Sequence, residues 1–432
     1  MIRLRKIFPF VAAVALLATS CHRDVFDEDY YKKLVEEEQP VKNIDPSHTW
    51  DLTSRYYMTV TRDVAKRSAH RLQILTGNPT TDEECIVLGD YLLDDSEKSY
   101  FAFVAPNNLK TFYAALIDDN GKCTVTSFTS DNRSINFSNP LATNAEMNTE
   151  KTSKQTFSYC FEDEMPQPGD YDYNDVVLRV SQERTAANQM TFDVTLAAVG
   201  SLTQVAAAIR LVGYGYDNIE SVTTIPDDLG ENFYKADGKS YRKTASLPFI
   251  DSEAMLVRGM NGEAVLNLFE DAHWATGYAN YTSEGYIHRY RYNVSAETGE
   301  DDDQVPPRTI SYVVTFKNPN QLDYFTLGDL DPFLVVEYNG VFMENHAVYK
   351  HMAATVLHEY VQPTSAVILP WALTVPSAGF RYPLNGQHIG YANDSGALFG
   401  AYMTEKHAFG EWARNANAAR DWYFYPTTNM VY

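Results

Sequence analysis

The sequence predicts a mainly β protein, built from antiparallel β-sandwich domains with one amphipathic helix near its C-terminus. Short runs of β-branched and aromatic residues recur along the chain, and each is bounded by Gly, Pro, Asn or Asp. Long helical patterns do not alternate with these runs, which argues against a doubly wound parallel sheet. The dipeptide Asn120-Gly121 lies between two β-rich runs and is the strongest hairpin signal in the chain.

The length of 432 residues predicts two or three domains, at about 150 residues per domain. We expect a lipoprotein signal peptide at 1–20, a tether at 21–43, a small N-terminal β-rich domain at 44–150 and a larger sandwich domain at 151–432. The boundary near residue 150 depends on residues 130–154, which are rich in Ser, Thr and Asn and typical of a linker or long surface loop.

The expected strands fall in both domains. In the first domain they are residues 56–61, 99–104, 111–117 and 122–128. In the second they are residues 175–181, 190–198, 205–212, 264–269, 310–317 and 333–338. Near the end of the chain, apolar residues at steps of three and four over 398–412 predict a helix that closes one end of the sandwich, with Asn393, Asp394 or Ser395 as its cap.

The first twenty residues have the features of a targeting segment. Three cations within the first six residues precede an apolar stretch at 7–17, which is too short to cross a hydrocarbon core of about 30 Å. The following Leu-Ala-Thr-Ser-Cys at 17–21 resembles a bacterial lipobox, so we expect cleavage before Cys21 and lipid on Cys21. An ordinary secretory peptide with an incidental cysteine is the alternative.

Acidic residues follow Cys21 closely, at positions 24, 27, 28 and 29. They resemble the signal that sends some Gram-negative lipoproteins to the outer face of the outer membrane, although a solvated tether is the alternative. We therefore expect an outer-membrane lipoprotein, exposed at the cell surface and held by its lipid. The formal net charge of −22 suits a soluble body on such a tether, and it argues against nucleic acid as a partner.

The most informative segment runs from residue 161 to 177, where an acidic loop precedes a strand. Asp170, Asp172 and Asn174 stand at i, i+2 and i+4, a spacing that turns alternate side-chain oxygens inward in a compact loop. No glycine follows at the EF-hand position and no helices flank the loop, so this is not an EF-hand. The expected Ca²⁺ ligands are Glu162, Asp163, Asp170, Asp172, Asn174 and Asp175. An Asx-rich turn without metal is the alternative.

The same segment carries a resemblance to a known family. Phe-Glu-Asp at 161–163 and Gly-Asp-Tyr-Asp-Tyr-Asn-Asp-Val-Val at 169–177 look like the signature of the LruC-domain family of bacterial surface lipoproteins. Leu-Pro-Trp-Ala-Leu at 369–373, Phe-Arg-Tyr-Pro at 380–383 and Asp-Trp-Tyr at 421–423 support it. The resemblance covers about residues 155–425 and implies a secreted or lipid-anchored β-rich domain with no established catalytic activity.

Enzyme signatures are weak in this chain. It has no GxSxG, P-loop or Rossmann fingerprint, and His358-Glu359 is followed by Gln362 where a zinc protease needs a second His. Glu270 and Asp271, near His273, could be a glycosidase carboxylate pair, and Asp329-Leu330-Asp331 could join the calcium site or form another. We expect no catalytic residues.

Three functions from different classes remain open. We expect a non-enzymatic surface protein that binds glycan or protein, or serves adhesion; a carbohydrate-active hydrolase and a structural subunit of a surface appendage are the alternatives. The 30 tyrosines fit a binding role, because Tyr gives rigid amphipathic contact area. Besides Cys21 the chain has Cys85, Cys123 and Cys160, so one disulfide could form and at least one of these residues is expected to be a buried small hydrophobe.

Overall fold

The computed structural model describes residues 33, 37–67, 69–81, 83–137, 145–165, 169–225, 255–295, 306–338, 340–347, 369–393, 396–399 and 407–432. The expected signal peptide, Cys21 with the acidic run behind it, and His358-Glu359 lie outside these residues. The described chain is mainly β, with several antiparallel sheets and only short helices, so the predicted fold class is confirmed. Among the described residues, no helix combines the length and apolar character needed to cross a membrane.

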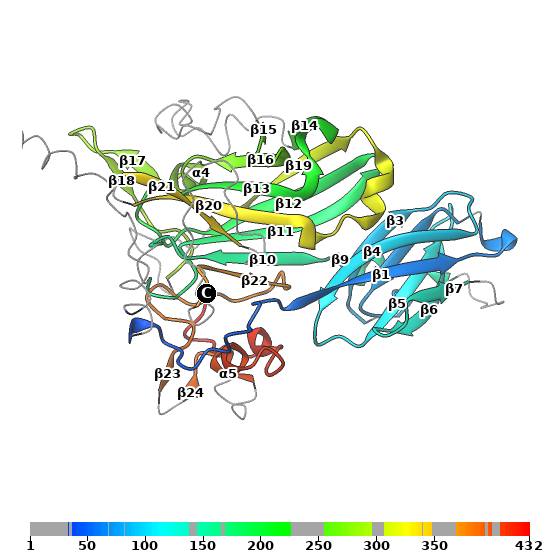
Figure 1. The fold of residues 1–432 in the computed structure, drawn as a ribbon, viewed down its shortest axis with the longest axis horizontal. Coiled ribbons are helices and arrows are strands. Elements are labelled where there is room, and N and C mark those ends of the chain that lie inside the picture. The colour runs from blue at the N-terminus through cyan, green and yellow to red at the C-terminus, as the bar shows by residue number, and fades with distance from the viewer. Residues whose placement is uncertain are drawn as a thin grey trace, which may run out of the picture.

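The N-terminal unit packs a three-stranded sheet (order β4-β1-β7) against a six-stranded sheet (order β8-β6-β5-β2-β3-β9; Figure 1). Its elements are β1 (Thr53–Thr61), η1 (Val64–Lys66), β2 (Arg71–Leu75), β3 (Cys85–Leu92), β4 (Lys98–Pro106), β5 (Thr111–Ile117), β6 (Lys122–Thr129), β7 (Ser134–Asn136), β8 (Ala145–Glu146), η2 (Thr149–Lys151) and β9 (Thr152–Lys154). Alternation along β1 buries Tyr56, Met58 and Val60 and exposes Arg55 and Tyr57. One face of this strand therefore forms core and the other forms surface.

Two details of this unit bear on the sequence predictions. The hairpin at Asn120-Gly121 is confirmed: it joins β5 to β6, Gly121 has φ +76°, and the Asp118 side chain accepts from the backbone N–H of Asn120 at 2.9 Å. The segment 130–154, expected as a linker, contains β7, β8 and β9, and β9 pairs in parallel with β3. Its Ser/Thr/Asn composition gives no local sign of these short strands, which form because sheet edges of the unit are available to pair with them.

The second unit is a larger sandwich of two sheets, ordered β14-β19-β12-β11-β10-β22 and β15-β16-β13-β20-β21, around one extended core. Its elements are β10 (Thr156–Phe161), β11 (Val176–Ala186), β12 (Gln189–Ala198), β13 (Ala206–Gly215), η3 (Tyr216–Asn218), β14 (Ile219–Ile225), β15 (Leu256–Arg258), β16 (Glu263–Phe269), α4 (Ala272–Thr276), β17 (Ala279–Tyr281), β18 (Ile287–Arg289), β19 (Arg308–Phe316), η5 (Pro319–Tyr324), η6 (Leu327–Asp329), β20 (Leu330–Tyr338), β21 (Val341–His346) and β22 (Ala372–Val375). All six strands expected here are present, with ends shifted by a few residues.

A third layer covers the outer face of the six-stranded sheet of the sandwich. Its elements are β23 (Ala392–Asn393), β24 (Gly396–Ala397), α5 (Phe409–Arg414) and η9 (Trp422–Phe424). Cys160 and Val177, which face each other on β10 and β11, form its floor, and Trp412 and Trp422 pack over them in one cluster. Residues 41–52 also pack here, with Trp50 against Trp412, so the N-terminal segment runs beside the C-terminal helix before it enters β1 (Figure 1).

The expected helix over 398–412 is wrong in extent. Ala392–Asn393 and Gly396–Ala397 form a two-stranded sheet, Leu398 lies in a turn, and the described helix covers only Phe409–Arg414. Residues 394, 395 and 400–406 lie outside the described chain. Leu398 and Phe399 are nonetheless fully buried in the same cluster as Phe409. The apolar spacing thus correctly indicated that Leu398, Phe409 and Trp412 are buried, but the burial of these side chains does not require one continuous helix.

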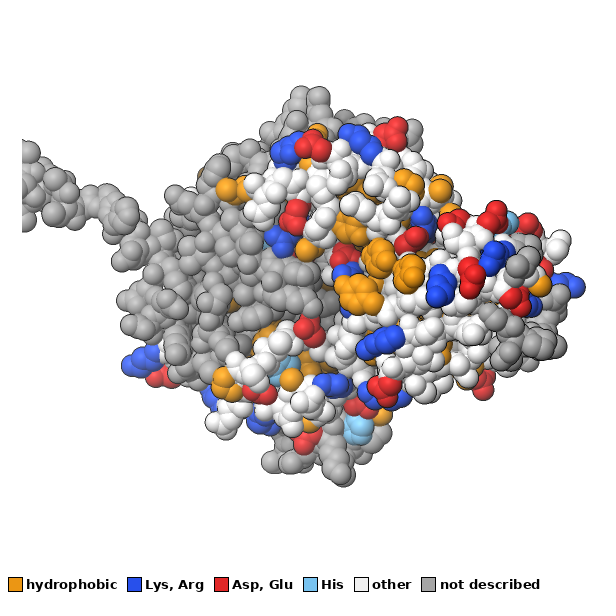
Figure 2. Space-filling view, turned by 45° about the vertical axis from the view of Figure 1, so that its right-hand side comes forward, with side chains coloured by type: hydrophobic (Ala, Val, Ile, Leu, Met, Phe, Trp, Pro, Cys, Tyr) orange, Lys and Arg blue, Asp and Glu red, His pale blue; other side chains and the backbone are white. Residues whose placement is uncertain are grey.

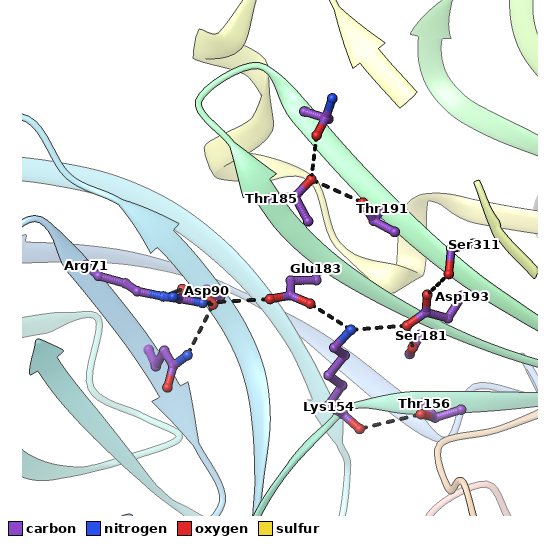
Figure 3. A network of polar contacts seen from close by, with 12 residues as sticks. Arg71, Asp90, Lys154, Thr156, Ser181, Glu183, Thr185, Thr191, Asp193 and Ser311 are labelled. Carbon is purple, nitrogen blue, oxygen red and sulfur yellow. Dashed lines mark hydrogen bonds and ion pairs between the residues drawn. The ribbon is translucent and has the colours of Figure 1, made fainter. Parts of the chain in front are cut away.

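Charged side chains connect the two units where β9 leads from one into the other (Figure 3). Arg71 on β2 binds Asp90 on β3 and stands 4.0 Å from the Glu183 carboxylate on β11. Lys154 Nζ lies 2.7 Å from Glu183 Oε2 and 3.1 Å from Asp193 Oδ2 on β12. These side chains are partly exposed, so each pair contributes at most about 1 kcal/mol and mainly favours one relative orientation.

Candidate metal centre

The acidic loop connects two adjacent antiparallel strands of the sandwich. Phe161, the last residue of β10, pairs with Val176, the first residue of β11. Glu162 and Asp175 lie just beyond these strand ends. The pairing therefore brings them together at the same end of the two strands, although the acidic loop separates them in sequence. The backbone N–H of Asp163 donates to Asp175 Oδ2 at 2.8 Å, which closes the base of the loop.

Two tyrosines give the loop its shape. Tyr171 and Tyr173 have φ +57° and +53°, in the left-handed region that costs a non-glycine residue about 1 kcal/mol or more. Both side chains are buried in the third-layer cluster, and the Tyr173 hydroxyl donates to the Pro370 carbonyl at 2.5 Å. Anchoring these rings in the core holds the strained backbone on either side of Asp172.

The Glu162 carboxylate is the hub of the loop. It is fully buried, and its two oxygens accept from the backbone N–H groups of Tyr171 at 3.0 Å and Tyr173 at 2.5 Å. Gly169 lies against it so closely that a Cβ there would overlap Glu162 Oε2 and stand 3.0 Å from Glu164 Oε2. Only glycine leaves room for this carboxylate, so Gly169 has a packing role that its place in a Pro/Gly turn did not reveal.

Two groups of carboxylates converge on this hub. Glu162, Asp170 and Asp172 have ligand oxygens within 4.8 Å of one another, and so do Glu162, Glu164 and Asp175. Burial is the main cause that raises the pKa of Glu162 and the pKa of Asp175 well above their ordinary values, and repulsion by neighbouring carboxylates adds to it. Burial likewise raises the pKa of Asp172 to about 7 and that of Glu164 to about 8. The cluster therefore resists ionisation unless a cation compensates it.

The structure brings together four of the six expected ligands, namely Glu162, Asp170, Asp172 and Asp175. It adds Glu164, which was not among the ligands expected from the sequence. The sequence feature that could have indicated Glu164 as a ligand is its position two residues after Glu162, in the same acidic segment. Asp172 is fixed by the backbone N–H of Gly386 at 2.7 Å and that of Asn174 at 3.1 Å.

The other two expected ligands have different surroundings. Asp163 Oδ2 accepts from the hydroxyls of Ser201 and, at 2.9 Å, of Thr203. The charge of Asp163 nonetheless acts on the cluster, where burial, helped by this charge, raises the pKa of Glu164, Asp170 and Asp175. Asn174 donates to the Pro383 carbonyl at 3.0 Å and packs against Gly200. Its Oδ1 is buried without a hydrogen-bond donor among the described residues. The amide nitrogen of Asn174 thus ties the loop to the C-terminal segment, and its role as a ligand through Oδ1 stays a prediction.

Other acidic candidates have structural partners. Asp271 caps α4 through the N–H of His273 at 2.9 Å and binds Arg289 at 2.8 Å, and both ring nitrogens of His273 contact backbone carbonyls. Asp329 completes a capping box with Thr326, and Asp331 stands 2.9 Å from His346. Among the described residues, neither Asp329 nor Asp331 belongs to the acidic groups above, so the idea that they join the calcium loop is not supported.

The three described cysteines, Cys85, Cys123 and Cys160, are free and buried. Burial raises the pKa of the Cys160 thiol to about 12, so this residue remains a neutral apolar side chain beneath the third layer. The disulfide left open by the sequence is therefore absent among these residues, and the expectation of at least one buried small hydrophobe holds for all three.

Comparisons with known proteins bear on the larger sandwich. No curated protein matches the chain. The crystal structure of a "Putative lipoprotein from Bacteroides ovatus" is similar at 14% identity and a TM-score of 0.45, over 84% of this chain and 99% of that chain. These comparisons do not name the LruC-domain family, which stays a prediction from the motifs. A family model matches residues 186–423, a range that begins after the acidic loop. Since that range is more than half of the sequence, the chain belongs to the family described as "Domain of unknown function (DUF4842)".

Proposed function

We propose that this chain is a non-enzymatic, lipid-anchored protein of the cell envelope, displayed on the outer face of the outer membrane. Its sandwich domain is braced by Ca²⁺ at the acidic loop and serves binding or adhesion. The observation that carries the calcium assignment is the convergence of five carboxylates, of which Glu162, Asp172 and Asp175 are buried, within two overlapping groups.

Calcium suits the donor set better than other common metals. Ca²⁺ takes six to eight oxygens at about 2.3–2.6 Å and tolerates irregular geometry, and both groups offer only carboxylate oxygens. Each oxygen of Glu162 that accepts a backbone N–H retains a second lone pair for a cation. Zinc prefers His and Cys, and neither residue type occurs in the two groups. Mg²⁺ demands near-octahedral geometry and keeps its waters.

A cation here would stabilise the fold and carry out no chemistry. The loop holds the C-terminal segment through two backbone contacts, from Gly386 N–H to Asp172 and from Ile389 N–H to the Tyr171 carbonyl at 2.7 Å. Neutralising the carboxylates would therefore strengthen both the loop and the docking of the third layer. At a concentration 100 times its dissociation constant, calcium adds about 2.7 kcal/mol to the stability of the folded state.

Calcium removal tests this part of the proposal. The soluble chain beginning at residue 22 should melt at a lower temperature in chelator than in Ca²⁺, and Mg²⁺ should restore the melt poorly. Asp172→Asn should abolish most of the calcium response. Asp119→Asn, at a carboxylate that is 79% exposed in the β5–β6 hairpin, should leave the response unchanged. A melt that ignores both chelator and Asp172→Asn would favour the Asx-turn alternative.

The anchor rests on the sequence. A cationic start, an apolar core and small residues before Cys21 support lipidation of that cysteine, and the acidic residues behind it support surface display. Cys21→Ala should move the protein from the membrane fraction to a soluble fraction. Unchanged membrane association of this variant would rule out Cys21 as the sole anchor. Protease added to intact cells should remove the protein, whereas full protection would place it on the periplasmic side.

A further inference from the structure

Three tyrosines lie exposed where the two units meet. Tyr57 on β1 and Tyr100 on β4 are 59% and 54% exposed, and Tyr324 at the end of η5 is 42% exposed. Tyr100 pairs with Thr59, two residues beyond Tyr57 on β1, so both rings share the outer face of the three-stranded sheet. The rings of Tyr57 and Tyr324 stand 6.5 Å apart at 43°. We call these three residues the tyrosine platform.

Figure 2 shows hydrophobic side chains gathered on the surface between the sandwich and the N-terminal unit. A hollow of about 510 Å³ opens beside Tyr324, and both units line it. Its polar side chains include Arg55 from β1 with Gln321 and Asp329 from the sandwich. That volume is within the range of small-ligand sites. The platform thus adjoins a concave surface that carries hydrogen-bonding groups.

The hollow has no uncompensated charge. Among the described residues, Arg55 and Asp329 are the only charged ones that line it, and they form an ion pair with each other. Arg55 also donates to Thr326 Oγ1 at 2.8 Å, so its guanidinium is held in place. The chain as a whole carries a net charge of −22. An anionic ligand would gain no free cation here and would meet repulsion from the rest of the protein.

We propose that the tyrosine platform and this hollow bind a neutral oligosaccharide. Sugar C–H groups carry partial positive charge and pack on the electron-rich faces of aromatic rings, while sugar hydroxyls pair with groups such as Gln321, Arg55 and Asp329. Rings from both units contribute, so an extended chain of sugars would cross the junction. The inference rests on the proposed function only in that display at the surface gives access to glycan.

A protein partner is the less favoured occupant. The core of a protein interface usually includes aliphatic side chains and Met beside its aromatic residues. The exposed large aliphatic side chains of the described chain lie on other elements: Ile86 and Leu92 on β3, Leu202 after β12, Ile225 at the end of β14 and Met260 after β15. The platform instead combines hydroxylated rings with a paired, polar hollow. This composition suits a hydroxyl-rich ligand of no net charge.

Calorimetric titration of the soluble chain with neutral linear hexasaccharides tests the proposal. The set comprises α-1,4- and β-1,4-glucose, mannose, xylose and N-acetylglucosamine hexamers. At least one should bind, Tyr57→Ala and Tyr324→Ala should each weaken it about tenfold or more, and Tyr57→Phe should retain most of the affinity. Tyr286→Ala is the matched control, because Tyr286 is 70% exposed before β18, away from the platform. Urea unfolding followed by circular dichroism, which reports on both units, should show all four variants folded as in the wild type.

Several results would overturn the proposal. One is that no neutral hexasaccharide binds at millimolar concentration; another is that Tyr57→Ala and Tyr324→Ala bind as the wild type does. Stronger binding of heparin or polygalacturonate than of any neutral sugar would contradict the charge argument. A photoreactive residue at position 57 that crosslinks to an envelope protein, without glycan binding, would assign the platform to a protein partner. None of these outcomes changes the calcium response or the anchor, so failure here is distinguishable from failure of the proposed function.

Discussion

Replacing Gly169 by alanine should test whether the Glu162 carboxylate organises the acidic loop. The new Cβ would overlap Glu162 Oε2, and this carboxylate cannot simply swing away because it is fully buried and bound to two backbone N–H groups. Moving it breaks the contacts with Tyr171 and Tyr173, which hold the left-handed residues of the loop. The methyl group also approaches Glu164 Oε2 at 3.0 Å, so the second acidic group is disturbed too.

The expected loss follows from these contacts. Hydrogen bonds to a charged group contribute about 1.5–3 kcal/mol each, so we expect Gly169→Ala to lower the free energy of unfolding in Ca²⁺ by about 3 kcal/mol. With a urea dependence of about 3 kcal/mol per molar, the midpoint should fall by about 1 M. Tryptophan fluorescence is a selective assay, because the five tryptophans of the chain all pack in the sandwich and the layer over it, and none lies in the N-terminal unit.

Gly379→Ala is the matched control for this variant. A Cβ at position 379 meets nothing within 4 Å, so the midpoint should stay the same or rise slightly as the unfolded chain loses entropy. Gly169→Ala should also weaken the calcium response of the melt, and Gly379→Ala should not. If Gly169→Ala unfolds at the wild-type midpoint and responds normally to calcium, Glu162 is not the hub of a metal site.

Two further predictions concern the same layer of the protein. In chelator, stability should fall from about pH 5 to pH 8, because burial raises the folded-state pKa of Asp172 to about 7 and that of Glu164 to about 8, so the unfolded chain releases these protons first. Each such carboxyl lowers the free energy of unfolding by about 1.4 kcal/mol per pH unit in this range. Added Ca²⁺ should make the free energy of unfolding less dependent on pH. Urea midpoints that stay level or rise with pH in chelator would refute this prediction. Trp50→Ala should lower the free energy of unfolding of the sandwich by about 3 kcal/mol, since the buried Trp50 ring packs on Trp412 with ring centroids 5.4 Å apart. The fluorescence of the remaining tryptophans follows this unfolding. An unchanged urea midpoint would mean that the N-terminal segment does not stabilise the C-terminal layer.

The acidic loop shows how far local sequence reasoning reaches. The spacing of Asp170 and Asp172 indicated a place where side-chain oxygens converge, because Pro and Gly residues before it predict a tight, irregular loop. The convergence of Glu162 and Asp175 depends on the pairing of β10 with β11, and β10 was not among the strands predicted from the sequence. Glu164 could not be found, since its position depends on how the loop folds back over Gly169. The bond from the Asn174 amide to the Pro383 carbonyl was not foreseen, because Pro383 comes from a distant segment.

The sequence by itself determined the mainly β fold class, several strands in each unit, the Asn120-Gly121 hairpin and the existence of the acidic loop. These features depend on alternation and turn chemistry within a few residues, which act before any tertiary contact forms. Only the tertiary structure decided that residues 41–52 pack on the C-terminal helix and that Tyr57 lies beside Tyr324 across two units. It also placed Leu398 in a turn and limited the described C-terminal helix to Phe409–Arg414. The physical reason is that the apolar face of a strand or helix gains stability from burial against any complementary apolar surface. The segment that provides this surface can come from any part of the chain, so local sequence does not identify it.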